Sequence, residues 1–469
     1  MRGFFLLVGL IAAAFAGGGA AIAAPSTEEV TAALRNATDY LNAISVEGGY
    51  RRDALDPGEA DDSETLNLVW VESPGTPQVG EALLAAWAAT GHERHLDAAA
   101  AAADALVRGQ LESGGWDRGI TFDPDERDLW AYRVGGAKVE ETRHMSTMFA
   151  NDTTPGALRF LIAFLDVADE HEGDLNTDEI HEAVLYGLDR IIDAQYPNGA
   201  WPQRFLGELE EDGTGDREPG RIPDDWPREW LRETYIHHYT LNDEAIGNCI
   251  RTLLAAWKWS GEGRFLKAAR EGGKFLIAAQ FPEPQAGWAQ QYNFDMEPAW
   301  ARPYEPPAVA SRESAEAVRV LLELYVATEE EQFIEPIPAF IDWIEDSAIA
   351  PDTWARYYEP RTNRPIYGDR DGHIYYDRDD IGQELANDYG WEDNFDIVKT
   401  IALYEAVLEG GHDAFRNGWR PGNAPPEARQ IEAILDDQDE EGRWLTDGRI
   451  EIATFVANME ALAAYLRDQ

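Results

Sequence analysis

The sequence predicts an all-α protein folded as an α/α toroid, a complete or partial α/α barrel with long loops and few short strands. Three observations favour this fold class. Apolar residues recur at helical spacing along the whole chain, extended segments are short, and similar turns followed by an aromatic residue end one helical stretch after another. Helix pairs that repeat with similar loops on one side are typical of arrays that curve into a ring.

The predicted helical stretches follow one another along the chain. The first begins after Pro25, where Ser26 and Glu29 have the spacing of a capping box. The later stretches are defined by apolar residues three or four positions apart, and they cover residues 80–91, 94–111, 154–171, 180–195, 244–261, 265–280, 314–330, 333–349, 395–410 and 458–468.

An aromatic residue that follows a turn separates each group of stretches from the next, and these residues are Tyr50, Trp116, Trp201, Trp288, Trp354 and Trp444. Each interval is long enough for one helix pair with its loops, so we expect six pairs. Two interpretations of the rings remain open. They either surround one mouth of the toroid, where sugars stack on indole rings, or fill the gaps between helix ends. Packing is the favoured interpretation for any single ring.

Residues 1–24 have the pattern of a secretory signal peptide, with Arg2 before an apolar stretch and a small-residue cleavage site at 21–23. No other run of the sequence approaches the ~20 apolar residues that a membrane span needs. We therefore expect a secreted or periplasmic protein with a single toroid catalytic domain over residues 25–469. Within it, residues 206–234 are acidic and rich in Gly and Pro, which predicts an insertion loop over the mouth.

The net charge of −49 is typical of a well-solvated acidic surface, and repeated binding of cations is the second interpretation. Nucleic acid is not an expected partner, because phosphate-binding faces need clustered Lys and Arg. An anionic substrate would need a local basic group. Nearby acids could instead pair with the candidate arginines, which are Arg302, Arg312, Arg356, Arg361, Arg364, Arg370 and Arg378.

Two aspartates precede predicted helices, Asp152 in FAND (149–152) and Asp243 in YTLND (239–243). One interpretation is that their carboxylates are helix N-caps. The other is a pair of ligands for calcium, which prefers about 6–8 oxygen atoms. The spacing alone leaves both open. The sequence contains none of the patterns of serine hydrolases, zinc proteases or phosphate-binding loops.

Five motifs resemble those of the pectate lyases of polysaccharide lyase family 10. They are WPQ at 201–203, YTLND at 239–243, WAQ at 288–290, ARPYEPP at 301–307 and TNRPIYGDRDG at 362–372. The resemblance covers roughly residues 114–391. It implies an α/α toroid that cleaves polygalacturonate, an acidic polysaccharide, by calcium-assisted β-elimination. The sequence differs from the family pattern at Arg118, Thr153 and around Glu384, where the family has a lysine, an asparagine and paired arginines.

The resemblance also implies roles for single residues. Asp152 and Asp243 match the calcium ligands, Arg302 matches the catalytic base, and Arg370 matches a substrate-binding arginine. A base role is unusual for arginine, because the pKa of its side chain is above ~12. The other motif residues expected to contact substrate are Arg364, Asn242, Trp201, Gln203, Trp288, Gln290, Tyr304 and Glu305.

Two other functions remain as alternatives. A glycoside hydrolase on the same fold would use paired carboxylates, for example Asp243 and Glu305. A non-catalytic glycan-binding toroid would use its tryptophan loops for contact alone. The lyase interpretation is preferred, because neither alternative accounts for ARPYEPP and TNRPIYGDRDG in one chain.

Overall fold

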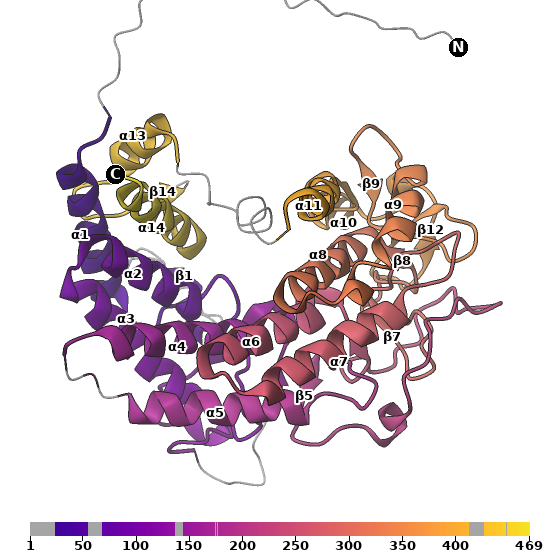
Figure 1. The fold of residues 1–469 in the computed structure, drawn as a ribbon, viewed down its shortest axis with the longest axis horizontal. Helices are drawn as coiled ribbons and strands as arrows, with labels where there is room; N and C mark the ends of the chain where they lie inside the picture. The colour runs from indigo at the N-terminus through magenta and orange to yellow at the C-terminus, as the bar shows by residue number, and fades with distance from the viewer. Residues whose placement is uncertain are drawn as a thin grey trace, which may run out of the picture.

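The computed structural model describes residues 24–54, 68–136, 144–173, 175, 177–411, 426–446 and 448–469. Its main helices alternate along the chain between an outer and an inner row, and both rows curve around one axis (Figure 1). The outer helices are α1 (Thr27–Ile44), α3 (Glu93–Gly109), α5 (Asp178–Asp193), α7 (Gly263–Ala279), α9 (Ile337–Asp346) and α13 (Ala428–Asp437). The inner helices are α2 (Thr76–Thr90), α4 (Thr153–Glu170), α6 (Ala245–Ser260), α8 (Ser311–Thr328), α11 (Ile397–Gly410) and α14 (Ile452–Arg467).

Neighbouring inner helices pack against each other in the order α14, α2, α4, α6, α8 and α11. The last helix of the chain therefore lies beside the first inner helix. Figure 1 shows the ring open between α11 and α14. The predicted α/α toroid is confirmed, and the described part of the chain forms a partial ring.

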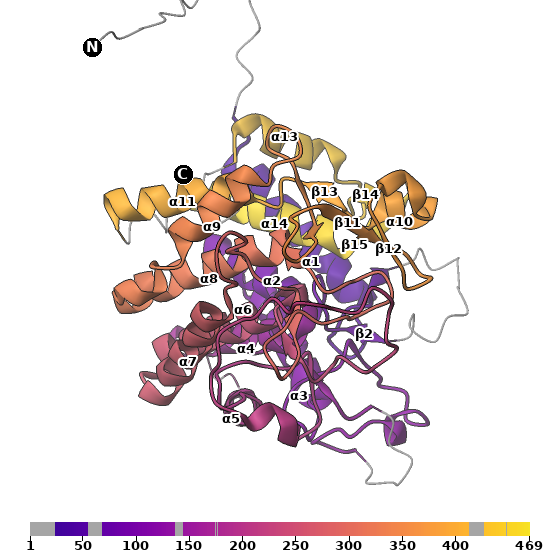
Figure 2. The same cartoon turned by 90° about the vertical axis from the view of Figure 1, so that its right-hand side faces the viewer.

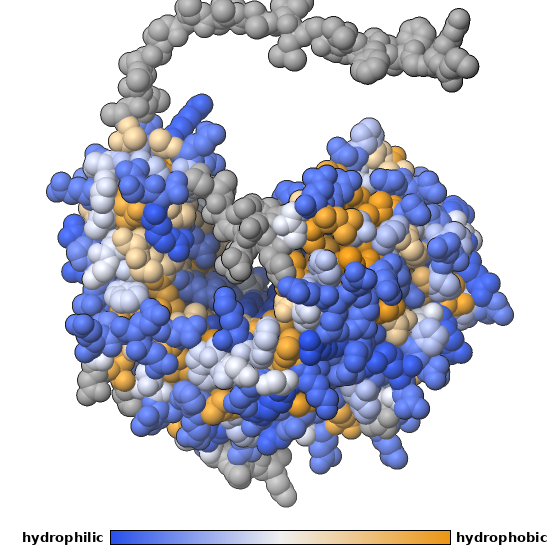
Figure 3. All heavy atoms as spheres, in the orientation of Figure 1, coloured by the Kyte–Doolittle hydropathy of each residue, from blue (hydrophilic) through white to orange (hydrophobic). Residues whose placement is uncertain are grey.

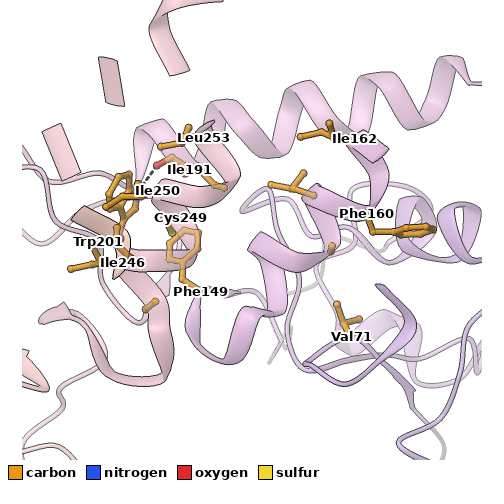
Figure 4. Close-up of a cluster of buried hydrophobic side chains, with 14 of the residues drawn as sticks. Val71, Phe149, Phe160, Ile162, Ile191, Trp201, Ile246, Cys249, Ile250 and Leu253 are labelled. Atoms are coloured by element: carbon orange, nitrogen blue, oxygen red, sulfur yellow. Dashed lines mark hydrogen bonds between the residues drawn. The ribbon is translucent and has the colours of Figure 1, made fainter. Parts of the chain in front are cut away.

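Each tryptophan of the repeated turns caps the outer helix that has just ended. Figure 4 shows the indole Nε1 of Trp201 donating to the carbonyl oxygen of Ile191 in α5, at 2.8 Å. The last four carbonyls of a helix have no partner within the helix, so this indole satisfies one of them. The same bond to the last turn of α3, α7, α9 and α13 is made by Trp116, Trp288, Trp354 and Trp444.

A glutamine that follows α3, α5, α7 and α13 connects each of these outer helices to the next one. The Nε2 of Gln110 donates to the carbonyl oxygen of Gly114 in the turn and to that of Ala183 in α5. The same pair of bonds is made by Gln195, Gln280 and Gln438, and the last of these reaches α1. Each such bond contributes about 1 kcal/mol net. The repeated glutamine, turn and aromatic residue is thus a structural unit of the ring.

Short antiparallel strands join the loops that precede neighbouring inner helices. Figure 2 shows the labelled strands gathered on one side of the helices. The two-stranded pairs are β2 (Val69–Trp70) with β3 (Gly119–Ile120), β4 (Thr147–Met148) with β5 (Arg204–Phe205), β6 (Tyr239–Thr240) with β7 (Gln291–Tyr292), and β9 (Trp354–Ala355) with β13 (Glu392–Asp393). The larger sheets are β8 (Val309–Ala310), β10 (Tyr357–Tyr358), β11 (Pro365–Gly368) and β12 (Ile374–Tyr375), and β1 (Asp53–Ala54), β15 (Arg449–Glu451) and β14 (Leu445–Thr446).

The loops themselves carry short helices, which are η2 (Arg127–Leu129), η3 (Ala150–Asp152), η4 (Glu211–Thr214), η5 (Asn242–Glu244), η6 (Glu331–Phe333), η7 (Arg378–Asp380) and α10 (Gln383–Asp388). The acidic segment 206–234 lies against two of these loops. The backbone N–H of Trp230 donates to Gly372 O, and its Nε1 donates to Ala301 O, both at 2.9 Å. The segment is therefore anchored beside the turn that holds Arg302.

One apolar core runs through the ring, and Cys249 is fully buried in it next to Ile246 and Ile250 (Figure 4). The outer surface is mostly hydrophilic in Figure 3, as the composition predicts. None of the helices in the described ranges is long and apolar enough to cross a membrane. The predicted signal peptide, residues 1–24, lies outside the described residues except for its last position.

Candidate active site

The site is built on two short helices at the amino-terminal ends of inner helices. Asn151 and Asp152 in η3, and Asp243 and Glu244 in η5, all have φ between 51° and 60°. Asn and Asp adopt this left-handed conformation more easily than most residues. η3 and η5 pack against each other, so the two predicted calcium ligands belong to adjacent segments.

The two aspartates have different partners. Asp152 precedes α4, but its side chain makes no capping hydrogen bond. Instead its Oδ2 pairs with the guanidinium of Arg159, which lies seven residues further along, in α4. Its Oδ1 is buried without a hydrogen-bond partner. Asp243 Oδ2 accepts from Asn242 Nδ2 at 3.2 Å and faces Arg302 Nη2 at 3.5 Å. Asp243 is therefore the aspartate that contacts the predicted catalytic residue.

Arg302 is fixed by a tight turn that closes on Glu305. The backbone N–H of Glu305 donates to Arg302 O at 2.9 Å, and that of Ala301 donates to Glu305 O at 3.1 Å. The carboxylate of Glu305 accepts from Arg302 Nη1 at 2.7 Å and from the Arg302 backbone N–H at 3.1 Å. Burial acts to lower the pKa of Arg302, but the carboxylates of Glu305 and Asp243 outweigh it and raise that pKa above its ordinary value.

A chain of hydroxyl groups continues from Glu305 into the protein. Tyr389 donates its hydroxyl to Glu305 Oε1 at 2.7 Å and lies 2.9 Å from the hydroxyl of Tyr357. Tyr357 in turn donates to Gln290 Oε1. The ring of Tyr304 packs edge-on against that of Tyr389, with centroids 5.0 Å apart. Gln290, Tyr304 and Glu305, three predicted substrate contacts, thus belong to one network around Arg302.

Two more arginines lie on the side of the site formed by the loops before α2 and α4. Arg118 Nε lies 2.8 Å from Glu72 Oε2, and Glu72 Oε1 accepts from Asn151 Nδ2 at 3.1 Å. Burial is the main cause of the raised pKa of Glu72, and the Asp243 carboxylate adds to it while Arg118 opposes it. Glu72 therefore lies within electrostatic range of Asp243, and Arg118 occupies the position where the family pattern has a lysine.

Arg204 pairs with Asp117 at 3.1 Å and donates to Ser146 Oγ at 2.8 Å. Arg204, Glu72 and Tyr389 were not among the predicted site residues. Arg204 directly follows the WPQ motif, and this adjacency was the available signal. Glu72 and Tyr389 lie far along the chain from their partners, so no local pattern points to them.

Most of the arginines that were candidates for a local basic group form ion pairs. Arg370 pairs with Glu384 at 2.8 Å, and both side chains are exposed at the rim of the site. Arg364 lies over the ring of Tyr376 at 4.0 Å. Acidic partners also face Arg312, Arg356, Arg361 and Arg378. The structural interpretation of these arginines therefore holds, and Arg302 is the one that reaches Asp243.

Burial corrects five predicted substrate contacts, which are Trp201, Trp288, Gln203, Asn242 and Gln290, the last of which is 3% exposed. Trp201 and Trp288 are 0% exposed and Gln203 is 5% exposed. Both indole nitrogens donate to helix carbonyls, so the two side chains pack between helices and present no face to a sugar. Asn242 is also 0% exposed, and its role is to contact Asp243. The aromatic residues that follow the repeated turns therefore pack in the core and do not form a surface on which sugars stack.

The donors for a cation are present but incomplete. Among the residues described by the structure, no three His, Cys, Asp or Glu side chains are grouped to hold a metal ion. The Asp243 carboxylate and the buried, unpartnered Oδ1 atoms of Asp152 and Asn242 are hard oxygen donors, which calcium prefers. They fit calcium as part of its shell.

No curated protein sequence matches the chain. Among solved structures, a mutant family 10 polysaccharide lyase from Cellvibrio cellulosa, in complex with trigalacturonic acid, is 20% identical and covers 71% of this chain and 98% of its own, with a TM-score of 0.48. A D-mannose isomerase is 14% identical over 96% of this chain and 100% of its own, with a TM-score of 0.45. A family 76 glycoside hydrolase from Bacteroides thetaiotaomicron is 11% identical over 94% of this chain and 99% of its own, also at 0.45.

Because these TM-scores are below 0.5, the family of the chain is assigned from the family model alone. The model described as pectic acid lyase matches residues 130–351 and 346–398, which together are more than half of the chain. The matched part contains η3, η5 and the turn that holds Arg302. The chain therefore belongs to the pectic acid lyase family and is an enzyme of the pectate lyase type.

Proposed function

We propose that this enzyme is a secreted, calcium-dependent lyase that cleaves polygalacturonate by β-elimination, with Arg302 removing the C5 proton. The observation that carries the proposal is the guanidinium of Arg302, held between Asp243 and Glu305 where the inner helices begin. Family membership supports the reaction class, and the five motifs support polygalacturonate as the polymer.

The reaction needs positive charge around one uronate. The C5 proton lies next to the uronate carboxylate, so neutralising that carboxylate makes the proton more acidic. Removal of the proton is followed by loss of the C4 oxygen, which leaves an unsaturated sugar. Arg118 and Arg204 supply cations around Glu72, which lies within electrostatic range of Asp243, and the amino-terminal ends of α4 and α6 add partial positive charge.

Arg302 must lose a proton before it can accept one. Glu305 and Asp243 keep its pKa above the ordinary value, so the free enzyme holds Arg302 as a cation. A neutral Arg302 therefore requires that substrate binding lower this pKa by weakening the contact with Asp243. The Asp243 contact, at 3.5 Å and partly exposed, is the weaker of the two and is the one that an incoming uronate can disturb.

Calcium would be held by Asp243, with Asp152 and Asn242 as further oxygen donors. When bound, the ion would neutralise the uronate carboxylate and so acidify the neighbouring C5 proton. Asp243 would then contact both the ion and Arg302.

The test uses the mature protein with polygalacturonate, alginate and glucuronan, each with calcium or with a chelator. Absorbance of the unsaturated product should rise on polygalacturonate with calcium and should stop on chelation. Arg302→Ala should remove this signal. Saturated reducing ends would instead identify a glycoside hydrolase, and absence of any product on all three polymers would refute the proposal.

Secretion rests on residues 1–24. The N-terminal sequence of the protein recovered from outside the cytoplasm should begin near residue 25. Recovery of the chain from the cytoplasm with Met1 intact would contradict this part of the proposal.

A further inference from the structure

We propose that Glu305 and Tyr389 are positioning residues that hold the guanidinium of Arg302 in its reactive orientation, and that Glu305 does not contact the substrate. The inference deepens the proposed function and rests on it. It changes the role of Glu305, because the sequence motif predicts a substrate contact and the glycoside hydrolase alternative predicts a catalytic acid.

The carboxylate of Glu305 has no free face. Its side chain is 1% exposed, its Oε1 accepts from Arg302 Nη1 and from the Tyr389 hydroxyl, and its Oε2 accepts from the Arg302 backbone N–H. A sugar cannot reach a carboxylate that is buried and bonded in this way. The same bonds hold Arg302 at two points, its backbone and the end of its side chain, which one ion pair could not do.

Tyr389 also holds the carboxylate of Glu305 in place. Its hydroxyl is 2.7 Å from Glu305 Oε1 and 2.9 Å from the Tyr357 hydroxyl, and the guanidinium of Arg356 lies 4.6 Å from the centre of its ring. Burial raises the pKa of Tyr389 well above its ordinary value, so the phenol keeps its proton and donates it to the carboxylate. Arg356 is itself paired with Glu313 at 3.5 Å.

The contact of Arg302 with Asp243 is different in kind. It is longer, at 3.5 Å, and both side chains are partly exposed, at 28% and 14%. An exposed pair is screened by water and contributes little to orientation. The orientation of Arg302 is therefore set from the buried side, by Glu305 and Tyr389, while its other edge faces the bound polymer.

Loss of this support should lower the rate of the chemical step and leave substrate binding nearly unchanged. Misplacement of a reacting group by about 1 Å can cost about 10²-fold in rate. We expect Glu305→Gln to lower kcat about 100-fold and Tyr389→Phe about 10-fold, with KM within about twofold of the wild type in both.

The matched controls are Glu359→Gln and Tyr358→Phe. Glu359 is a buried acid, 5% exposed, that accepts from Thr362 and Tyr376, and Tyr358 is a buried tyrosine that donates to Ser347 O. Neither contacts Arg302. Both controls should keep kcat within about twofold of the wild type, and thermal unfolding of every variant shows whether a loss of rate is a loss of fold.

A rescue experiment separates positioning from stability. Guanidinium chloride at low millimolar concentration should restore part of the activity of Arg302→Ala, because Glu305 still offers a buried carboxylate for the added cation. The double variant Arg302→Ala, Glu305→Gln should show no rescue. If the wild type is inactive on every uronate, the proposed function fails. If the wild type is active and Glu305→Gln keeps kcat, or raises KM alone, this inference is wrong.

Discussion

Replacement of Trp201 by Phe distinguishes a packing role of the repeated aromatic residue from a sugar-binding role. Trp201 is 0% exposed, and its Nε1 bonds the Ile191 carbonyl at 2.8 Å. Phe cannot donate, so the carbonyl loses its partner, at a cost of about 1–3 kcal/mol. The smaller ring leaves a cavity of about 40 Å³, which adds about 1 kcal/mol. We expect the free energy of unfolding to fall by about 2–4 kcal/mol.

The assay is urea unfolding followed by far-ultraviolet circular dichroism, with initial rates measured on the folded protein. Trp259→Phe is the control, because Trp259 is only partly buried near the end of α6. That variant should lose less than about 1 kcal/mol. In both variants KM should equal that of the wild type. A KM raised several-fold in Trp201→Phe, with the unfolding midpoint unchanged, would show that the indole contacts the polymer and that the packing argument is wrong.

Three further outcomes are expected. Arg302→Lys keeps the charge but loses the guanidinium, whose two terminal nitrogens face Glu305 and Asp243, so kcat should fall by about 10²–10³-fold. Arg221→Lys, at an exposed arginine, should leave kcat unchanged, and equal kcat values in the two variants would contradict the role of Arg302. Asp243→Asn should weaken calcium binding about tenfold by calorimetric titration without substrate, and unchanged affinity would exclude Asp243 as a ligand. Burial lowers the pKa of His95, which is hydrogen-bonded to Thr38 at 2.7 Å, to about 4. Between pH 6.5 and 4 the unfolded chain binds a proton that the folded chain does not, so the free energy of unfolding should fall as pH falls, by up to about 3 kcal/mol, and His95→Gln should flatten this dependence in urea titrations.

Much of the fold could be predicted, because it follows from local patterns that repeat. Apolar spacing located the helices, and the recurring glutamine, turn and aromatic residue marked the ends of α3, α5, α7 and α13. The contacts that these repeated residues make could not be predicted from the sequence. The indole of Trp116 bonds Leu106, only ten residues earlier, whereas Gln110 bonds Ala183, which is 73 residues away. The second contact exists only because the next helix pair packs beside the first.

The candidate site was predicted in part for the same reason. Arg302 and Glu305 are three residues apart, so one motif contains both. Tyr389 is 84 residues from Glu305, and Glu72 is 79 residues from Asn151. These partners depend on how the loops before different inner helices meet. The pairing of Asp152 with Arg159 also changed the expectation, because it ties one predicted calcium ligand to an arginine of its own helix.

The acidity of the chain explains why its arginines at the site are paired. With a net charge of −49, the protein meets a polyanion of its own sign, so attraction must be local. Arg118, Arg204 and Arg302 each face a carboxylate that orients the guanidinium, and each guanidinium has more donors than one carboxylate can use. The pairs differ in what an incoming uronate can replace. Glu305 is buried and stays, whereas Asp243 and Glu72 are partly exposed and can give up a guanidinium edge. When substrate binds, its uronate carboxylate then replaces Asp243 or Glu72 beside a guanidinium that is already oriented. Buried Glu305 keeps its contact with Arg302 throughout.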